Sequence, residues 1–260
     1  MTRLNIDAHL VYDLPTPADL LLQVEVADIA GQAVTAGGMA LPDDLKIHRI
    51  PAEAALGERV WLRGEGRFEA RYTVEVEVTR PAPDLARLPA TPYADLTAEA
   101  TSFLMPSRYC PSDLFAATVI DLFGTKTGGP LAQGIRDWIR DHFAYVPGSS
   151  DASTTALDSY MTRQGICRDY AHVFVTMARA AGLPARVASV YAPGVEPPDF
   201  HAVAEVWLAG AWHLADPTGM AGPEEIAVIG VGRDAAEVSF LTIQGRADLV
   251  EQSVTCDRAA

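Results

Sequence analysis

Residues 164–184 read QGICRDYAHVFVTMARAAGLP, and this stretch has the pattern of a helix that begins at a cysteine. Its polar residues recur every three to four positions and predict a polar stripe opposite an apolar face: Arg168, His172, Thr176 and Arg179. The sequence GLP at residues 182–184 is a typical stop signal for a helix. We therefore predict a helix from Cys167 to Ala181.

Three segments with strand-like character follow this helix: 186–191, 201–208 and 211–216. The last two are separated by Ala209-Gly210, which we interpret as a two-residue turn. With that turn, Asp216 lies opposite Val203 and shares a face with His201, its diagonal neighbour. A turn that differed by one residue would put the two side chains on opposite faces. The prediction that His201 and Asp216 can meet is therefore conditional on the turn.

Three helical segments are predicted before residue 164. Ser112 can cap the first, which runs to Phe123, and Pro130 can open the second. The third begins at Thr155, with Asp158 three residues later in the pattern of a capping box. Helices thus precede the sheet in this half of the chain, as in the α+β class.

Residues 1–80 alternate apolar and polar side chains, as half-buried antiparallel strands do, and predict an N-terminal β-sandwich separate from the rest. Residues 81–92 contain four prolines and read as a linker. We therefore predict an α+β protein with two domains. Residues 1–95 form the antiparallel β-sandwich, and residues 96–260 form a core of helices followed by antiparallel sheet and C-terminal strands.

The composition restricts the partners of the protein. Thirty-four acidic against 20 basic residues give a net charge of −14, which repels nucleic acid and anionic membrane surfaces. No apolar run approaches the roughly 18 residues of a membrane-spanning helix, and residues 1–15 lack the features of a secretory signal. We expect a cytoplasmic protein without nucleic acid or membrane partners. A homo-oligomer is compatible with the sequence.

The three cysteines have a spacing that fits neither a disulfide framework nor a zinc site, and no metal or cofactor is predicted. A lone cysteine is usually a small buried hydrophobe, which is our prediction for Cys110 and Cys256. Cys167 differs, because free N–H groups in the first turn of a helix stabilise a thiolate. Gly165 allows a sharp entry into that helix, and the Cys167 N–H could serve an oxyanion.

A thiolate nucleophile needs an imidazolium to protonate the leaving group and a third group to orient that ring. Cys167, His201 and Asp216 supply these groups, and the alternative is that the last two merely mark strand ends. Further candidates for the oxyanion site or the cleft are Gln164, Arg168, Asp169 and Tyr191. Three of them have a plain structural alternative: a helix end for Gln164, a solvent-facing charge for Arg168 and a favourable first-turn charge for Asp169. Tyr191 is expected at the rim of the cleft.

Four blocks of this sequence resemble the transglutaminase-like superfamily, in particular its bacterial branch of putative cysteine proteases: GICRDYA at 165–171, RAAGLPAR at 179–186, HA at 201–202 and ADPT at 215–218. The resemblance covers residues 98–219. It implies a papain-like core, with the cysteine on a buried helix and the histidine and aspartate on adjacent strands, preceded by a β-sandwich region. Val203 stands where the family commonly has tryptophan, so the specificity of relatives does not carry over.

The expected activity is that of a cysteine peptidase or amidase, which hydrolyses an amide bond through a thioester on Cys167. The substrate would be a peptide, a protein or a small amide. Transamidation by a bound amine, and acyl transfer to an arylamine, use the same triad and stay open. A third alternative, a non-catalytic binding module, is less favoured because Cys167, His201 and Asp216 are all present.

Overall fold

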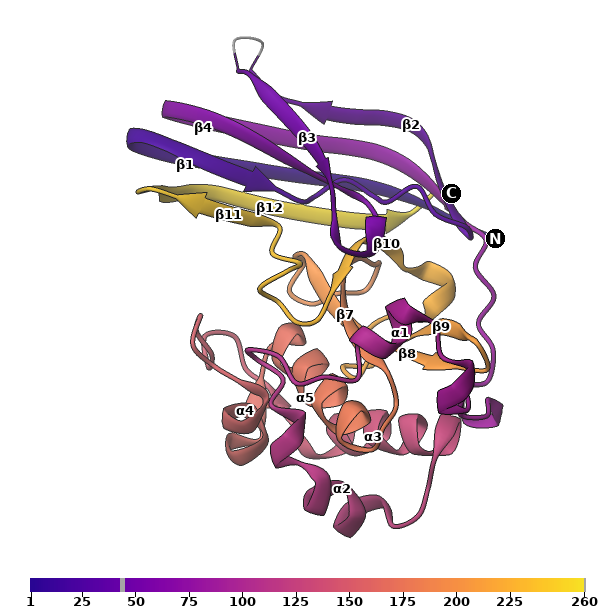
Figure 1. The fold of residues 1–260 in the computed structure, drawn as a ribbon. Coiled ribbons are helices and arrows are strands. Elements are labelled where there is room, and N and C mark those ends of the chain that lie inside the picture. Colours follow the sequence, from indigo (N-terminus) through magenta and orange to yellow (C-terminus); the bar gives the residue numbers. More distant parts are fainter. Residues whose placement is uncertain (43–44, 260) are drawn as a thin grey trace.

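Two antiparallel sheets organise the part of the chain that the computed structural model describes, residues 1–42 and 45–259 (Figure 1). The larger sheet has the order β11-β1-β4-β2, with β12 beside β1 and β3 beside β4. Its strands are β1 (Thr2–Leu22), β2 (Gln32–Ala40), β3 (Ile47–Pro51), β4 (Glu58–Val78), β11 (Leu241–Gln244) and β12 (Asp248–Arg258). Because β1 and β12 are antiparallel partners, the two ends of the chain lie side by side.

The smaller sheet and the helices form the other layer of the molecule. The sheet has the order β10-β7-β8-β9, from β7 (Ala185–Tyr191), β8 (His201–Leu208), β9 (Ala211–Ala215) and β10 (Ala227–Gly232). The helices are α1 (Ala98–Ser102), α2 (Ala116–Phe123), α3 (Gly128–His142), α4 (Ala156–Thr162) and α5 (Cys167–Ala180). A short parallel pair, β5 (Ala144–Tyr145) and β6 (Gln164–Gly165), lies just before α5. Helices followed by an antiparallel sheet confirm the α+β prediction.

The alternating sequence of β1 and β4 separates a buried apolar face from a charged outer face. On the outer face the two strands are joined by ion pairs such as Asp7 with Arg71. Pairing of β1 with β4 is interrupted between Leu14 and Ala18, where Pro15 and Pro17 lack the N–H groups that a ladder needs. Both strands nevertheless remain continuous over 21 residues.

The N-terminal strands form one antiparallel sheet, whereas a sandwich requires two stacked sheets. Tyr191, Phe200, Ala227 and Ile229 of the core cover the apolar face of this sheet, as a second N-terminal sheet would have done. The expectation that residues 1–80 stay out of the sheet containing His201 is confirmed.

The C-terminal strands depart from the predicted organisation, which grouped them with the core of residues 96–260. Both β11 and β12 pair with β1 and so belong to the N-terminal sheet. Without them, one side of the 21-residue β1 would expose a row of unpaired backbone groups. Pairing with the end of the chain protects that edge.

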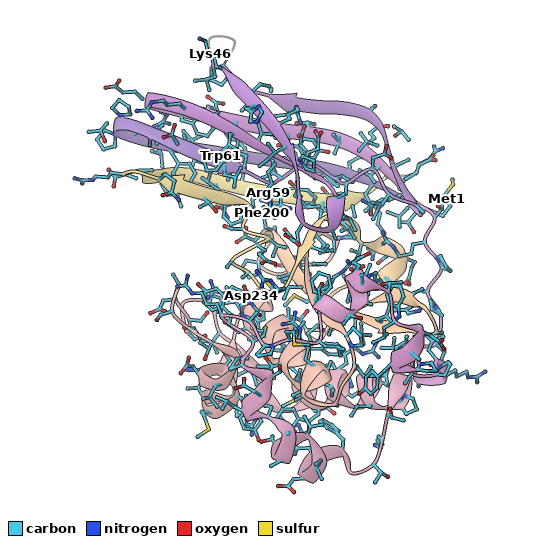
Figure 2. All side chains as sticks on the ribbon, in the orientation of Figure 1. Met1, Lys46, Arg59, Trp61, Phe200 and Asp234 are labelled. Carbon is cyan, nitrogen blue, oxygen red and sulfur yellow. The ribbon has the colours of Figure 1, made fainter. Side chains whose placement is uncertain are left out.

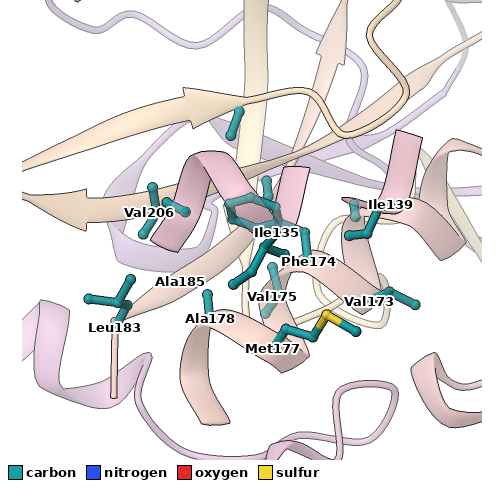
Figure 3. Close-up of a cluster of buried hydrophobic side chains, with 14 of the residues drawn as sticks. Ile135, Ile139, Val173, Phe174, Val175, Met177, Ala178, Leu183, Ala185 and Val206 are labelled. Atoms are coloured by element: carbon teal, nitrogen blue, oxygen red, sulfur yellow. The ribbon is translucent and has the colours of Figure 1, made fainter. Parts of the chain in front are cut away.

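Helix α5 passes through the centre of the core, where its side chains pack against α3 and the smaller sheet (Figure 3). The predicted polar stripe is wrong, because His172, Thr176 and Arg179 are all buried. The Arg179 guanidinium explains the burial, since it donates to the carbonyl oxygens of Met105 (3.1 Å), Ala185 (2.8 Å) and Arg233 (2.7 Å). These bonds hold neighbouring segments over the side of the helix that sequence alone assigns to solvent.

Candidate active site

A cleft of about 590 Å³ lies where α5, β8 and the segment before β11 meet. Cys167 and His201 both line it, and both side chains are largely buried. Further lining residues come from the loop between β5 and α4, from the loop before β8 and from residues 235–242. The six-stranded sheet contributes Thr242 of β11 to this lining, so the two layers share the cleft.

Cys167 is the first residue of α5, as predicted. The turn that enters the helix is closed by Asp169, whose Oδ2 accepts hydrogen bonds from the Ile166 N–H (2.8 Å) and from the Ser150 hydroxyl (2.6 Å). This carboxylate is fully buried and folds back against Gly165. The local sequence thus fixes the start of the helix, and with it the position of the thiol.

Gly165→Ala is expected to destabilise the protein, because a Cβ at this position would lie 2.5 Å from the Cβ of Asp169. Such overpacking typically costs about 1–3 kcal/mol of unfolding free energy. Gly134→Ala in α3 is the matched control, since its Cβ would meet only the Phe123 ring at 3.5 Å. Chemical denaturation should show a lower unfolding free energy for Gly165→Ala and no decrease for Gly134→Ala. Equal unfolding free energies would contradict the close packing of Gly165 against Asp169.

His201 and Asp216 meet as the predicted hairpin requires. The register of β8 and β9 pairs Ala204 with Ala215, which is the alignment of a two-residue turn at Ala209-Gly210. His201 Nε2 lies 3.1 Å from Asp216 Oδ2. The other ring nitrogen, Nδ1, is buried without a hydrogen-bond partner among the described residues and is available to the Cys167 thiol.

The Asp216 carboxylate is held by several donors in addition to the imidazole. Its Oδ1 accepts from the Thr218 N–H and hydroxyl, and its Oδ2 accepts from the N–H groups of Met220 and Ala221. Burial opposes the charge, but the hydrogen bonds to His201 and Thr218 outweigh it and lower the pKa of Asp216. Asp216 is therefore a fixed, ionised partner for the ring.

The charge state of His201 follows from the same balance. Burial alone would lower its pKa, but the hydrogen bond to Asp216, the Asp216 charge and the neighbouring Cys167 raise the pKa to about 10. The imidazolium form thus persists through the neutral range. A cation beside a thiol stabilises the thiolate, which is the reactive species in attack on a carbonyl.

Tyr145 is a member of the site that the sequence did not reveal. It lies in β5, and the parallel pairing of β5 with β6 brings it to the start of α5. Burial and the interaction with the neighbouring Cys167 raise the pKa of its hydroxyl, which therefore stays protonated. No periodicity or motif marks a two-residue strand, so only the tertiary pairing identifies this residue.

The remaining predicted site residues have different positions. Arg168 lines the cleft and donates to the Ser150 hydroxyl (3.1 Å) and the Asp151 carbonyl (2.9 Å), while Asp169 lies beneath as the helix cap. Gln164 is exposed in β6 and is not among the residues that line the cleft. Tyr191, expected at the rim, is fully buried, and its hydroxyl donates to the Val24 carbonyl (2.7 Å). Tyr191 therefore joins the two layers instead of contacting substrate.

The other two cysteines have no comparable surroundings. Cys110 is fully buried in the helical core, and burial raises the pKa of its thiol to about 12. Cys256 lies in β12, where burial likewise raises its pKa to about 12. Both positions agree with a structural role.

We expect iodoacetamide to alkylate Cys167 at least about tenfold faster than Cys110 or Cys256 in the folded protein. Because the pKa of His201 is raised to about 10, its cation is present throughout the range from about pH 6.5 to pH 8.5. His201→Ala removes this cation and should therefore slow alkylation of Cys167 across the same range. Peptide mapping with mass spectrometry measures all three sites, and equal labelling would contradict an activated thiol.

Comparison with protein families gives a match to the transglutaminase-like superfamily over residues 122–217. This range includes all of α3, α4, α5, β7, β8 and β9, and it ends just beyond Asp216. The crystal structure of a putative cysteine protease from Cytophaga hutchinsonii superposes with a TM-score of 0.94 at 28% sequence identity. The match covers 100% of this chain and 91% of that chain, so the sheet with its C-terminal strands is shared as well.

Two curated relatives match over shorter segments. An uncharacterized protein of Mycobacterium leprae is 29% identical over 113 residues, which is 40% of each chain. The protein-glutamine gamma-glutamyltransferase of Pseudomonas aeruginosa is 34% identical over 97 residues, which is 32% of this chain and 14% of that protein. The chain thus spans well under two thirds of these relatives. None of the helices that the structure describes has the length and apolar character needed to cross a bilayer.

Proposed function

We propose that this chain, whose residues 122–217 match the transglutaminase-like superfamily, is a cysteine-dependent acyl-transfer enzyme that hydrolyses an amide bond in a peptide, protein or small amide. One observation carries the proposal: His201 lies between the Asp216 carboxylate and Cys167 at a cleft that both His201 and Cys167 line. A nucleophile, a proton donor and an orienting carboxylate are the groups that acyl transfer through a thioester requires.

In the proposed acylation step, the Cys167 sulfur attacks the carbonyl carbon of the substrate and forms a C–S bond. Negative charge develops on the carbonyl oxygen, and the N–H groups in the first turn of α5 lie where they can stabilise it. His201 then gives its Nδ1 proton to the departing nitrogen as the C–N bond breaks. Asp216 holds the ring through Nε2 and offsets its charge.

In the deacylation step, water attacks the thioester while neutral His201 accepts a proton. The C–S bond breaks, the acid product leaves, and the proton on His201 restores the starting ion pair with Cys167. Bulk water competes for the thioester in any cleft that solvent can reach, which favours water as the acceptor. Hydrolysis therefore stands ahead of transfer to an amine.

A primary amine in place of water would give transamidation. This alternative is retained because the Pseudomonas aeruginosa relative is a protein-glutamine gamma-glutamyltransferase. A screen of peptides, glutamine-containing peptides and small amides, each with and without a primary amine, separates the two activities. Release of free acid in the absence of amine supports hydrolysis. Turnover only with amine, accompanied by incorporation of the amine into product, would replace hydrolysis by transamidation.

A binding module without catalysis is the remaining alternative. It predicts that substrates protect Cys167 from alkylation but are recovered unchanged after prolonged incubation. A trapped thioester, detected as a mass increase on Cys167 after acid quenching, would exclude a binding-only role.

A further inference from the structure

The cleft has an apolar side whose residues take no part in the proposed chemistry. Phe200, which directly precedes His201, and Phe240, which precedes β11, both line it. Their rings stack with centroids 4.4 Å apart and planes 8° apart. We call this pair the aromatic wall. Val187, Ala202 and Val238 extend the same apolar lining.

The aromatic wall is backed by further aromatic side chains and is therefore preformed. Phe200 packs on Tyr191 at 5.5 Å, and Tyr191 stacks on Tyr72 of β4 at 6.3 Å. Phe200 accordingly lies at the junction between the six-stranded sheet and the layer below it (Figure 2). Phe240 is fixed through its backbone, because its carbonyl accepts a hydrogen bond from the Gln23 N–H (2.9 Å).

Phe240 is partly exposed, although Phe200, the other member of the wall, is buried. A fixed aromatic ring that faces a cleft can bury apolar surface of a ligand without a cost for reordering the protein. Stacked or edge-to-face contact adds a preference for an aromatic ligand over an aliphatic one. The position of the wall next to His201 places such a ligand group close to the bond that the proposed reaction cleaves.

We propose that the aromatic wall is the specificity-determining subsite of this cleft and binds an aromatic side chain of a peptide substrate beside the scissile bond. That the bound peptide is cleaved rests on the proposed function, whereas binding of an aromatic group at the wall depends only on the cleft. Phe240 is its exposed member, and Phe200 positions the Phe240 ring.

Asp199, a charged residue that lines the cleft, could instead favour a ligand with a cationic group. Asp199, next to Phe200, has one carboxylate oxygen that accepts hydrogen bonds from the Phe200 N–H (2.7 Å) and the Gln252 side chain (2.7 Å). Its second oxygen could bind a cationic group. The aromatic wall consists of two stacked rings backed by Tyr191, so we place the aromatic preference first.

Affinity labelling of Cys167 tests the subsite without requiring turnover. Iodoacetamide, its N-benzyl derivative and its N-(2-aminoethyl) derivative all react by displacement of iodide, and each rate is divided by the rate with free cysteine. The N-benzyl reagent should react at least about tenfold faster than iodoacetamide on this scale, which is the size of effect that an apolar pocket gives. Phe240→Ala should remove most of this preference, and Phe240→Leu should keep part of it.

Leu241→Ala is the matched control, because Leu241 is the next residue along the chain and is not among the residues that line the cleft. It should retain the N-benzyl preference. Equal normalised rates for the three reagents in the unmodified protein, or a preference for the aminoethyl reagent, would overturn the inference. A clear N-benzyl preference in a protein that hydrolyses no amide would support the subsite and refute the proposed hydrolysis, so the two failures are distinguishable.

Discussion

Cys167→Ala is expected to abolish amide hydrolysis, with a fall in kcat of up to about 10⁶-fold, the size seen when a nucleophile that acts with its triad is removed. A thioester requires a thiol, and among the described residues that line the cleft Cys167 is the only cysteine. Continuous assays with a substrate from the amide screen measure the loss. If Cys167→Ala retained more than about a thousandth of the activity, that rate would exceed what the rest of the site can supply, and Cys167 would not be the nucleophile.

Cys256→Ala is the matched control for this substitution. Cys256 lies in β12, does not line the cleft, and should be replaceable without loss of turnover. Thermal unfolding of both variants separates loss of the nucleophile from loss of the fold. If both variants lost activity equally while remaining folded, the assignment of Cys167 as the nucleophile would be wrong.

Asp216→Asn is expected to lower kcat roughly 10³- to 10⁴-fold. An amide in place of the carboxylate can hold the His201 ring in the wrong tautomer and cannot stabilise the imidazolium. The elevated pKa of His201 should fall once the Asp216 charge is removed. The His201 cation, and with it the fast alkylation of Cys167, should therefore be lost at a lower pH in this variant than in the unmodified protein, which a purely structural defect would not produce.

The near-equal size of Asn and Asp does not make this substitution neutral for stability. Asp216 Oδ1 accepts from the Thr218 N–H, and Oδ2 accepts from the N–H groups of Met220 and Ala221. Asn keeps one oxygen acceptor, but the amide nitrogen that replaces the other oxygen can accept no hydrogen bond. Leaving a buried donor unpaired costs about 1–3 kcal/mol, so the loss of turnover has to be compared at a temperature where the variant is folded.

Thr218→Val provides the control for Asp216→Asn. It removes one hydroxyl donor to Asp216 Oδ1 and leaves the contact of Oδ2 with His201 in place. Its kcat should fall less than about tenfold, in keeping with the loss of one hydrogen bond. If Asp216→Asn kept full activity on a substrate that Cys167→Ala could not turn over, Cys167 would remain the nucleophile and another residue would orient His201.

The sequence by itself determined the features that depend on neighbours in the chain. Gly165 and Asp169 are local signals for the start of α5, and they place Cys167 in its first turn. The Ala209-Gly210 turn determines the β-hairpin register, which in turn puts His201 and Asp216 on one face. Because these signals lie within a few residues of the groups they position, the contact of His201 with Asp216 could be predicted without a structure.

Tertiary structure alone decided the features that depend on contacts between distant segments. It buries His172 and Tyr191, whose sequence surroundings indicated an exposed helix stripe and a cleft rim. It also brings Tyr145 to Cys167 and Phe240 to Phe200, and it pairs the C-terminal strands with β1. Periodicity reports that a side chain faces one side of a helix or strand, but what covers that side is set by segments far away in the sequence. The composition of the cleft is therefore a tertiary property, although the arrangement of its proposed catalytic residues is largely encoded locally.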